Sequence, residues 1–290
     1  MKKVLFDTDI GSDIDDALAL AYLLREPACE LLGITTVSGE PEKRAMLASA
    51  ICHAAGRGDI PIYPGLVGPV VGKQLQPKAS QAEQLGGWKY DMEFPQFGAI
   101  EFMRRTIREN PGEVTLLAVG PMTNVAALFM LDPEIPSLLD SLVLMCGDFT
   151  EGTERNEWNS KCDWASTVCV YANQAKLHRT FGLNVTLQVV IGKDDVERAL
   201  VGDITKPVKD FSKSFFASGA TKMIFHDPLA AVAVFHPEVC TYETGNVSIS
   251  IDLPKRGYST FKACEEGKHQ IAVTVDPDRF FDIYLNTVNQ

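Results

Sequence analysis

Five aspartates fall within ten residues near the N-terminus, in the segment Asp7-Thr8-Asp9-Ile10-Gly11-Ser12-Asp13-Ile14-Asp15-Asp16. No lysine or arginine stands between Lys3 and Arg25. Carboxylates gathered on one turn repel one another and lose hydration, so they need a cation that neutralises them. Their oxygens are hard ligands of the kind that Ca²⁺ and Mg²⁺ prefer. The segment therefore predicts a divalent-cation site, whereas one or two aspartates alone would be explained as an acidic helix start.

The elements around this acidic turn predict its place in a sheet. Residues 4–6 form a short apolar run that ends at Asp7, and residues 17–24 are a stretch of helix formers. The acidic segment is therefore expected to lead from a strand into a helix. Because ligands bind outside the carboxyl ends of the strands in an open parallel sheet, the turn should lie at the functional edge of that sheet.

The rest of the N-terminal half alternates strand-like and helix-like segments. Apolar or β-branched runs predict strands at 30–37, 60–63, 114–119 and 141–145, and helices are expected at 41–55, 100–109 and 124–131. This order predicts βαβ units and a parallel sheet. Residues 64–95 and 146–162 show little periodicity, so we expect two long irregular segments, the first of them a surface loop.

The order becomes less regular after residue 160. Helices are expected at 163–173, 204–219, 227–235 and 277–288, and residues 239–275 alternate in short β-type runs. No repeat or linker divides the chain. We therefore expect a single α/β domain over residues 1–290, with one open, mainly parallel, Rossmann-like sheet flanked by helices and a mixed or antiparallel C-terminal extension.

The composition excludes several classes of protein. The 290 residues carry 27 Lys+Arg against 38 Asp+Glu, and a net charge of −11 argues against a nucleic-acid or anionic-membrane surface. Hydrophobic residues make up 46% and charged residues 22% of the chain, which is typical of a folded globular protein. An odd set of seven cysteines without a CxxC pair indicates reduced thiols. With no signal-peptide pattern and no long apolar run, we expect a cytoplasmic protein with no membrane partner.

Five segments together resemble the inosine-uridine-preferring nucleoside hydrolase family. The first is the acidic turn, which has two more residues between Gly11 and Asp15 than the family's usual DxDxGxDDA. The resemblance covers nearly the whole chain, and the joint pattern is much more specific than any one segment. The other four segments, in chain order, are Thr35-Thr36-Val37-Ser38-Gly39, Val119-Gly120-Pro121-Met122-Thr123-Asn124, Glu157-Trp158-Asn159 with Asp163, and His226-Asp227-Pro228.

The resemblance implies a Ca²⁺-dependent hydrolase that splits the N-glycosidic bond of a ribonucleoside into ribose and a nucleobase. In that family, calcium holds the ribose hydroxyls and a nucleophilic water. Asp9 is implied as the general base that activates the metal-bound water. Asp7 is implied to lie behind the metal ligands. Asp15 is implied to contact the substrate as well as the metal. The implied metal ligands are Asp9, Asp15, Asp16, Asp227 and the backbone carbonyl of Val119.

Other matched positions are implied to surround the substrate. Glu157 and Asn159 would hold sugar hydroxyls, Trp158 would pack against the sugar or the base, and Met145 would line the floor of the pocket. From the residues alone, Trp158 is also compatible with a core aromatic, and Met145 with a core residue of a strand. Asn124 follows a Gly-Pro turn at a helix start and is interpreted as a cap rather than a substrate ligand.

His226 is implied to protonate the leaving base or to hydrogen-bond it. An ordinary histidine has a pKa of ~6.5 and can supply a proton near neutral pH. The alternative is a structural histidine beside Asp227. The remaining four, His53, His178, His236 and His269, are interpreted as structural or surface residues.

The chain also departs from the family pattern on the substrate side. Glu40 stands where the family has a sugar-contacting Asn, and Thr153 aligns loosely with another such Asn, so both are assigned as substrate contacts of changed chemistry. The extra Asp13 is interpreted as a solvent-facing residue, with a second general base as the alternative. The family's His-containing loop has no His here and offers Gln74, Gln76, Gln81, Gln84 and Trp88 instead.

Two other functions remain open from the residues. A haloacid-dehalogenase-type phosphatase also begins with a strand followed by Asp-x-Asp, but no basic residue near the turn would meet a phosphate. A non-catalytic, Ca²⁺-dependent sugar or nucleoside binding protein is compatible with the changes at Glu40 and Thr153. The family resemblance further implies a small-molecule nucleoside substrate, a role in purine or pyrimidine salvage, and a homodimer or homotetramer.

Overall fold

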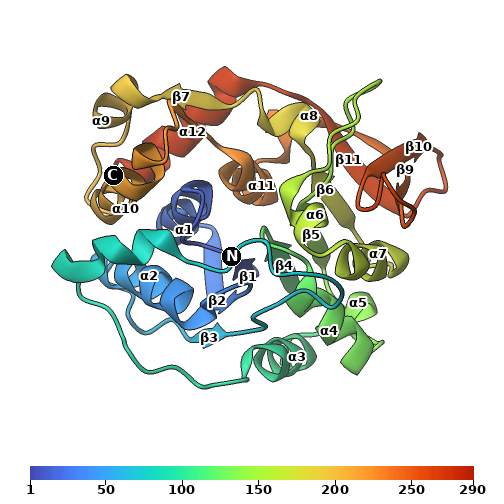
Figure 1. The fold of residues 1–290 in the computed structure, drawn as a ribbon, viewed down its shortest axis with the longest axis horizontal. Coiled ribbons are helices and arrows are strands. Elements are labelled where there is room, and N and C mark those ends of the chain that lie inside the picture. The colour runs from blue at the N-terminus through green and yellow to red at the C-terminus, as the bar shows by residue number, and fades with distance from the viewer.

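The computed structural model describes residues 1–290 and is built on one central sheet (Figure 1). A second, two-stranded sheet consists of β7 (Val190–Gly192) and β8 (Lys222–Ile224). The nine strands of the central sheet, in spatial order, are β10 (Ser259–Ala263), β9 (Cys240–Ile249), β11 (His269–Val275), β6 (His178–Phe181), β5 (Ser141–Met145), β4 (Val114–Ala118), β1 (Lys2–Thr8), β2 (Cys29–Thr36) and β3 (Ile62–Pro64).

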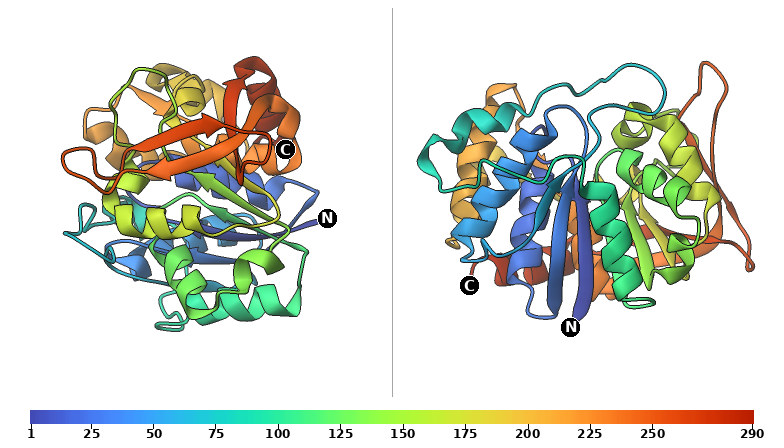
Figure 2. Two further views of the ribbon diagram at one scale, coloured as in Figure 1. Left: turned by 90° about the vertical axis from the view of Figure 1, so that its right-hand side faces the viewer. Right: turned by 90° about the horizontal axis from the view of Figure 1, so that it is seen from below.

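The central sheet is parallel from β3 to β11, and β9 and β10 complete it as antiparallel strands. The left-hand view of Figure 2 shows this orange-red antiparallel extension in front of the parallel strands. The expected fold class, a mainly parallel sheet with an antiparallel C-terminal extension, is confirmed. None of the cysteines forms a disulfide.

Helices cover both faces of the sheet (Figures 1 and 2). Short 3-10 helices are η1 (Ser80–Gly87), η2 (Lys193–Asp195) and η3 (Pro237–Val239). No helix combines the length and the hydropathy that a membrane span requires. The α-helices, in chain order, are α1 (Asp15–Arg25), α2 (Pro41–Ala54), α3 (Ala99–Glu109), α4 (Thr123–Leu131), α5 (Ile135–Leu138), α6 (Trp158–Cys162), α7 (Trp164–Ala172), α8 (Leu183–Thr186), α9 (Val196–Ala199), α10 (Thr205–Ala217), α11 (His226–Phe235) and α12 (Pro277–Val288).

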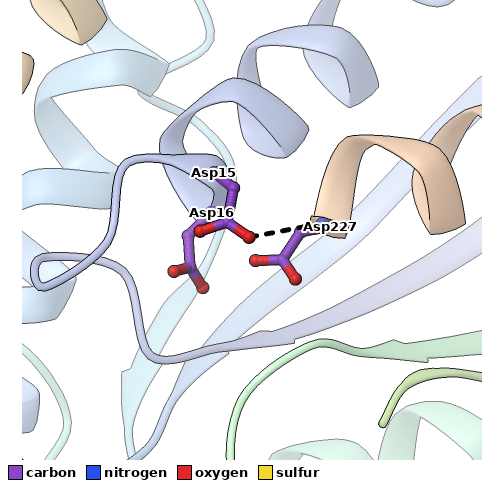
Figure 3. Close-up of side chains that lie close together, drawn as sticks. All are labelled: Asp15, Asp16 and Asp227. Carbon is purple, nitrogen blue, oxygen red and sulfur yellow. Dashed lines mark hydrogen bonds between the residues drawn. The ribbon is translucent and has the colours of Figure 1, made fainter. Parts of the chain in front are cut away.

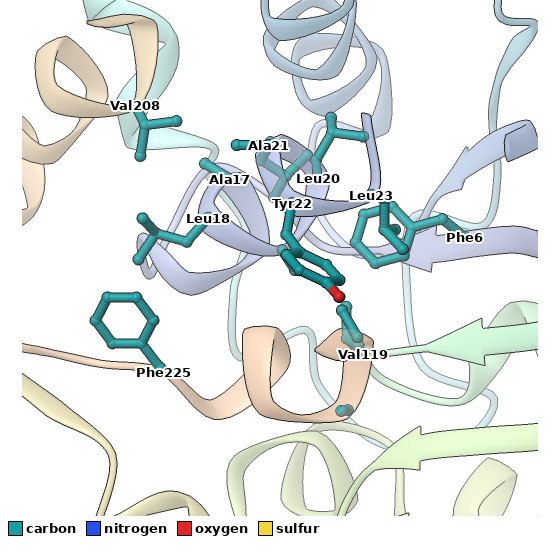
Figure 4. Packing of buried hydrophobic residues seen from close by; sticks show 14 of the residues in the cluster. Phe6, Ala17, Leu18, Leu20, Ala21, Tyr22, Leu23, Val119, Val208 and Phe225 are labelled. Carbon is teal, nitrogen blue, oxygen red and sulfur yellow. The ribbon is translucent and has the colours of Figure 1, made fainter. Parts of the chain in front are cut away.

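Strand alternation divides the core into two layers. Successive side chains of a strand point to opposite faces, so Val4 and Phe6 of β1 join one apolar cluster and Leu5 joins the other. The first cluster contains side chains of α1, α2, α10, α11 and α12, and the second contains side chains of α3, α4, α5 and α7. Figure 4 shows Leu18 and Tyr22 of α1 packed in the first cluster beside α11. This packing fixes the start of α1 against the start of α11.

The strand order reverses between β1 and β4. From β1 the chain proceeds to β2 and β3 on one side, and β4, β5 and β6 follow on the other side. In doubly wound sheets the crevice at such a reversal, outside the carboxyl ends of the strands, is where ligands bind. The acidic turn follows β1 and Val119 follows β4, so both lie at this crevice.

Some expected elements differ from the structure. No strand was predicted at residues 178–181, and these residues form β6, a short buried strand held between β5 and β11. The segment 64–95 is not only a surface loop, because it contains η1 and buries Gln76, Gln81 and Leu85. Asn124 does not cap α4. Its Nδ2 donates to Asp7 Oδ1 at 2.7 Å and to the Thr36 carbonyl at 3.1 Å, which ties the ends of β1 and β2 to α4.

Candidate active site

A cavity of about 510 Å³ opens at the crevice between β1 and β4. Most of the residues predicted for the site line it: Asp9, Asp15, Asp16, Val119, Met145, Glu157, Trp158, Asn159, His226 and Asp227. Asp13 also lines it, from an exposed position at its edge. Leu183, Phe215 and Ser218 also line the cavity, although none of them belongs to the motifs that indicated a site.

Three buried aspartates form the acidic centre of this cavity. Each of Asp15, Asp16 and Asp227 offers a carboxylate oxygen, and these oxygens all lie within 4.8 Å of one another. Figure 3 shows Asp15 and Asp16 at the first turn of α1 and Asp227 at the first turn of α11, with their carboxylates turned toward one another. Asp16 is held by Thr8, whose hydroxyl donates to Asp16 Oδ1 at 2.5 Å.

The electrostatics of this cluster favour a bound cation. Burial raises the pKa of the Asp15 and Asp227 carboxyls well above the usual range, and repulsion from the neighbouring aspartates raises it further. Burial also raises the pKa of Asp16 well above its usual range, and the Thr8 hydrogen bond and the Arg44 guanidinium only partly offset this rise. Three converging carboxylates with hard oxygen ligands fit a divalent cation such as Ca²⁺ or Mg²⁺, because its charge removes the repulsion that otherwise favours protonation.

Asp9 stands beside the cluster, at the end of β1. Its Oδ2 accepts a hydrogen bond from Gln76 Nε2 at 2.5 Å, and burial raises the pKa of its carboxyl. Gly120 makes room for it: a Cβ at position 120 would lie 2.9 Å from Asp9 Oδ1 and 2.8 Å from Val37 Cγ1. The Gly-Pro turn after β4 therefore lets two strand ends approach closely.

Asp7 lies behind the cavity, as the resemblance implies. It is fully buried, accepts a hydrogen bond from Thr35 Oγ1 at 2.5 Å in addition to the one from Asn124, and leaves Oδ2 without a partner. Burial raises the pKa of this carboxyl to about 7. Asp7 thus links β1, β2 and α4 beneath the acidic turn.

Glu157 and Asn159 line the cavity, but backbone groups occupy much of their hydrogen-bonding capacity. Glu157 caps α6 by accepting from the N–H groups of Asn159 at 2.6 Å and Ser160 at 3.0 Å. Asn159 Nδ2 donates to the carbonyls of Val119 at 2.6 Å and Met145 at 3.0 Å. The two side chains therefore join the ends of β4 and β5 to α6.

Trp158 and Met145 occupy different environments. The Trp158 side chain is 45% exposed, so it is not a core aromatic, and its Nε1–H donates to Gln76 Oε1 at 2.6 Å. Met145 is 4% exposed and belongs to the apolar core while also lining the cavity, so the two interpretations of this residue are compatible.

His226 lies at the start of α11. Its Nδ1 is 2.7 Å from the hydroxyl oxygen of the buried Thr186, a partner that the sequence did not indicate. Burial, with a smaller effect of Lys222, lowers the pKa of His226 to about 4. The ring is therefore neutral at neutral pH in the free chain, which differs from the ordinary pKa assumed for this residue.

Glu40 and Thr153 lie outside the cavity lining, so the structure does not bring them together with the other predicted site residues. Glu40 adopts a left-handed conformation with φ of 55° just before α2, and its carboxylate meets Lys43 Nζ at 2.6 Å and the Ala79 N–H at 3.0 Å. Thr153 is exposed, and its hydroxyl donates to the Thr150 carbonyl at 3.0 Å. Both side chains make local contacts that hold loops.

Arg44 is a buried cation that the sequence analysis missed. It comes from the first turn of α2, and its guanidinium donates to the carbonyls of Asp9, Ile10 and Gly39. It also reaches the Gln76 and Lys78 carbonyls at 3.4 Å each. Arg44 therefore fixes the backbone of the acidic turn to the segment that crosses over it. The only sequence signal was its place at the start of a helix that follows the second strand.

The fold and the cavity together place a cluster of buried carboxylates at the switch point of a doubly wound sheet. Residues 4–282 match the model of the family described as inosine-uridine preferring nucleoside hydrolase, and the chain belongs to that family. These matches favour an N-glycosyl hydrolase over the phosphatase and the non-catalytic binder.

Related proteins carry consistent names. The chain is 29% identical over 269 residues to uridine nucleosidase 1 of Arabidopsis thaliana, covering 86% of this chain and 78% of the relative. It is 30% identical over 256 residues to the pyrimidine-specific ribonucleoside hydrolase RihA of Citrobacter koseri, covering 82% of this chain and 80% of the relative. The structure resembles a plant nucleoside hydrolase with a TM-score of 0.85 and 25% identity over 99% of both chains.

A second solved structure has the same fold as this chain. The purine-preferring ribonucleoside hydrolase from Gardnerella vaginalis has a TM-score of 0.85 at 24% identity, covering 99% of this chain and 98% of that chain.

Proposed function

We propose that this protein hydrolyses the N-glycosidic bond of a ribonucleoside in a Ca²⁺-dependent reaction. The observation that carries the proposal is the position of the Asp9 carboxylate in the same cavity as the converging carboxylates of Asp15, Asp16 and Asp227. Family membership and the nucleosidase relatives support the class of bond that is cleaved.

The proposed ligands of the cation are Asp9, Asp15, Asp16, Asp227 and the carbonyl of Val119. When bound, a hard divalent cation supplies charge neutralisation, a lower pKa of a coordinated water, and an anchor for sugar hydroxyls. The Val119 carbonyl is aligned by the Asn159 amide, so this ligand is held by α6 as well as by β4.

Asp9 acts as the general base in this proposal. Its Oδ2 is engaged with Gln76, and the carboxylate accepts the proton of the attacking water as the glycosidic bond breaks through an oxocarbenium-like state. Asp15 contacts the sugar as well as the cation. Glu157 and Asn159 confine the sugar by holding the cavity wall, while Trp158 and Met145 supply apolar surface against the substrate.

His226 serves the departing base. Neutral imidazole donates a hydrogen bond through one ring nitrogen, and Thr186 occupies the other. The base that leaves as an anion is stabilised by this donor.

A homodimer or homotetramer, a cytoplasmic location and a role in nucleoside salvage stay predictions.

The test is a screen for release of reducing sugar from purine and pyrimidine ribonucleosides, deoxynucleosides and nicotinamide riboside. We expect turnover of at least one ribonucleoside, loss of activity after exhaustive chelation, and recovery on adding Ca²⁺. Full activity after chelation contradicts the role of the cation. Stoichiometric nucleoside binding without sugar release across the panel instead favours a non-catalytic binding protein.

A further inference from the structure

The side-chain amide of Gln76 lies between two residues of the cavity. Its Nε2 donates to Asp9 Oδ2 at 2.5 Å, and its Oε1 accepts from Trp158 Nε1 at 2.6 Å. The indole N–H is only a donor and a carboxylate is an acceptor, so the orientation of the amide is determined by its two partners. Gln76 thereby connects the end of β1 to the first residue of α6.

Neighbouring groups hold the Gln76 backbone in place. Its N–H donates to Gln74 Oε1 at 2.7 Å, and its carbonyl accepts from Arg44 Nη2 at 3.4 Å and from the Ser38 hydroxyl at 3.5 Å. A Cβ at Gly39 would lie 2.5 Å from the Gln76 carbonyl oxygen, so the missing side chain at position 39 permits this approach. The Gln76 side chain is 8% exposed and is therefore fixed from several sides.

We propose that Gln76 is a positioning residue, whose amide fixes the rotation of the Asp9 carboxylate and is itself fixed by the Trp158 indole. This inference rests on the proposed function of Asp9. An aspartate carboxylate turns about its Cβ–Cγ bond with only a broad torsional preference, so a hydrogen bond to one oxygen narrows its orientation. The amide holds Oδ2 and leaves both lone pairs of Oδ1 for the cation and for the proton of the water. A loss of this orientation lowers the rate more than it weakens substrate binding.

Replacement of the amide by an apolar side chain tests this arrangement. Gln76→Leu removes both hydrogen bonds, whereas Trp158→Phe removes only the indole donor and keeps an aromatic ring. We expect Gln76→Leu to lower kcat about tenfold or more with KM within about threefold, and Trp158→Phe to lower kcat less. Because the indole acts through Gln76, the double variant should lose less than about twofold beyond Gln76→Leu alone.

A matched control and a spectroscopic measurement separate positioning from a general loss of structure. Gln84 lies on η1 of the same segment, donates to Ser214 Oγ at 3.1 Å, and is outside the cavity lining, so Gln84→Leu should leave kcat and KM unchanged. In protein labelled with 5-fluorotryptophan, the ¹⁹F signal assigned to Trp158 by its absence in Trp158→Phe should shift in Gln76→Leu and not in Gln84→Leu.

Three kinetic results would overturn the proposal: a Gln76→Leu enzyme with kcat within about twofold of wild type, a change in KM alone, or fully additive losses in the double variant. An unchanged ¹⁹F signal in Gln76→Leu would also overturn it, because the bond to Trp158 would then be absent. Failure of the proposed function looks different: the wild-type protein would release no sugar, while the ¹⁹F comparison would still report the Gln76–Trp158 contact.

Discussion

The backbone N–H of Asp227 faces Asp15 Oδ2 at 3.4 Å, although 212 positions separate the two residues in the chain. The contact joins the first turns of α1 and α11 (Figure 3). These two helices pack through apolar side chains, and the ring centroids of Tyr22 and Phe235 lie 6.2 Å apart. The acidic centre is therefore created by helix packing and not by the acidic turn alone.

Calcium should stabilise the fold, and Asp227 should be required for that effect. A ligand that binds only the native state raises its stability according to the ligand concentration and the dissociation constant. We expect Ca²⁺ to raise the melting temperature of the wild-type protein and to have little effect on Asp227→Asn. Thermal unfolding with and without chelator checks this, and Asp252→Asn, at an exposed position, serves as the control. A melting temperature independent of Ca²⁺ in the wild type would count against the cation site.

Replacement of Asp9 should abolish most of the turnover. Asp9→Asn keeps the size of the side chain but removes the proton acceptor, and a general base typically contributes ~10²–10⁴-fold. The matched variant is Asp13→Asn, because Asp13 is the exposed rival at the edge of the same cavity. We expect a small loss there. Steady-state kinetics of both variants measures the two losses of kcat. A large loss in Asp13→Asn with a small loss in Asp9→Asn would assign the general base to Asp13.

The loss caused by His226→Ala should depend on the leaving group. A purine or pyrimidine needs a hydrogen bond or a proton to depart, whereas p-nitrophenolate departs without one. We expect a much larger loss of kcat/KM with natural nucleosides than with p-nitrophenyl riboside. Equal losses on both substrates would mean that His226 shapes the cavity or supports Asp227 without assisting the base. Thermal unfolding of the variant provides the control for folding.

His178, which is outside the cavity lining, should make the fold sensitive to acid. The ring is fully buried, stacks on Tyr171, meets His269 edge-on at 4.7 Å between ring centroids, and has no hydrogen-bond partner at either nitrogen. Burial, helped by repulsion from His269, lowers the pKa of His178 from 6.5 to about 3. The unfolded chain then binds a proton that the folded chain does not, so stability falls as the pH drops below 6.5.

The variant His178→Leu removes this titration at little hydrogen-bonding cost, since neither ring nitrogen has a partner. The free energy of unfolding of the wild type should fall between pH 6.5 and 4.5 more steeply than that of His178→Leu, by up to about 1.4 kcal/mol per pH unit for one proton. Urea unfolding across that pH range measures the two slopes. Parallel pH dependences would show that His178 titrates normally in the folded chain.

The sequence predicted the parts of the site that depend on strand ends. Asp9, Val119 and Met145 follow or end buried strands, and parallel strands place their carboxyl ends at one edge. Strand β6 was missed because its four residues, His-Arg-Thr-Phe, are too short and too polar for a strand pattern, and pairing on both sides stabilises them instead.

The positions of the Glu40 and Gln76 side chains have a tertiary cause. Motif alignment placed Glu40 beside the sugar, but its left-handed backbone turns the carboxylate toward Lys43 and the Ala79 N–H. The segment around Gln76 has no periodicity, and its path over the acidic turn is set by contacts with Arg44 and Trp158. Such contacts between distant residues leave no local pattern in the chain.

The order in which the ligands occur along the chain also bears on biosynthesis. Asp9, Asp15 and Asp16 leave the ribosome first, and Asp227 follows 212 positions after Asp15. A nascent chain that ends before α11 carries the acidic turn without the carboxylate that completes the cluster. The free energy of binding a cation at the complete cluster would consequently become available only after α11 has been synthesised.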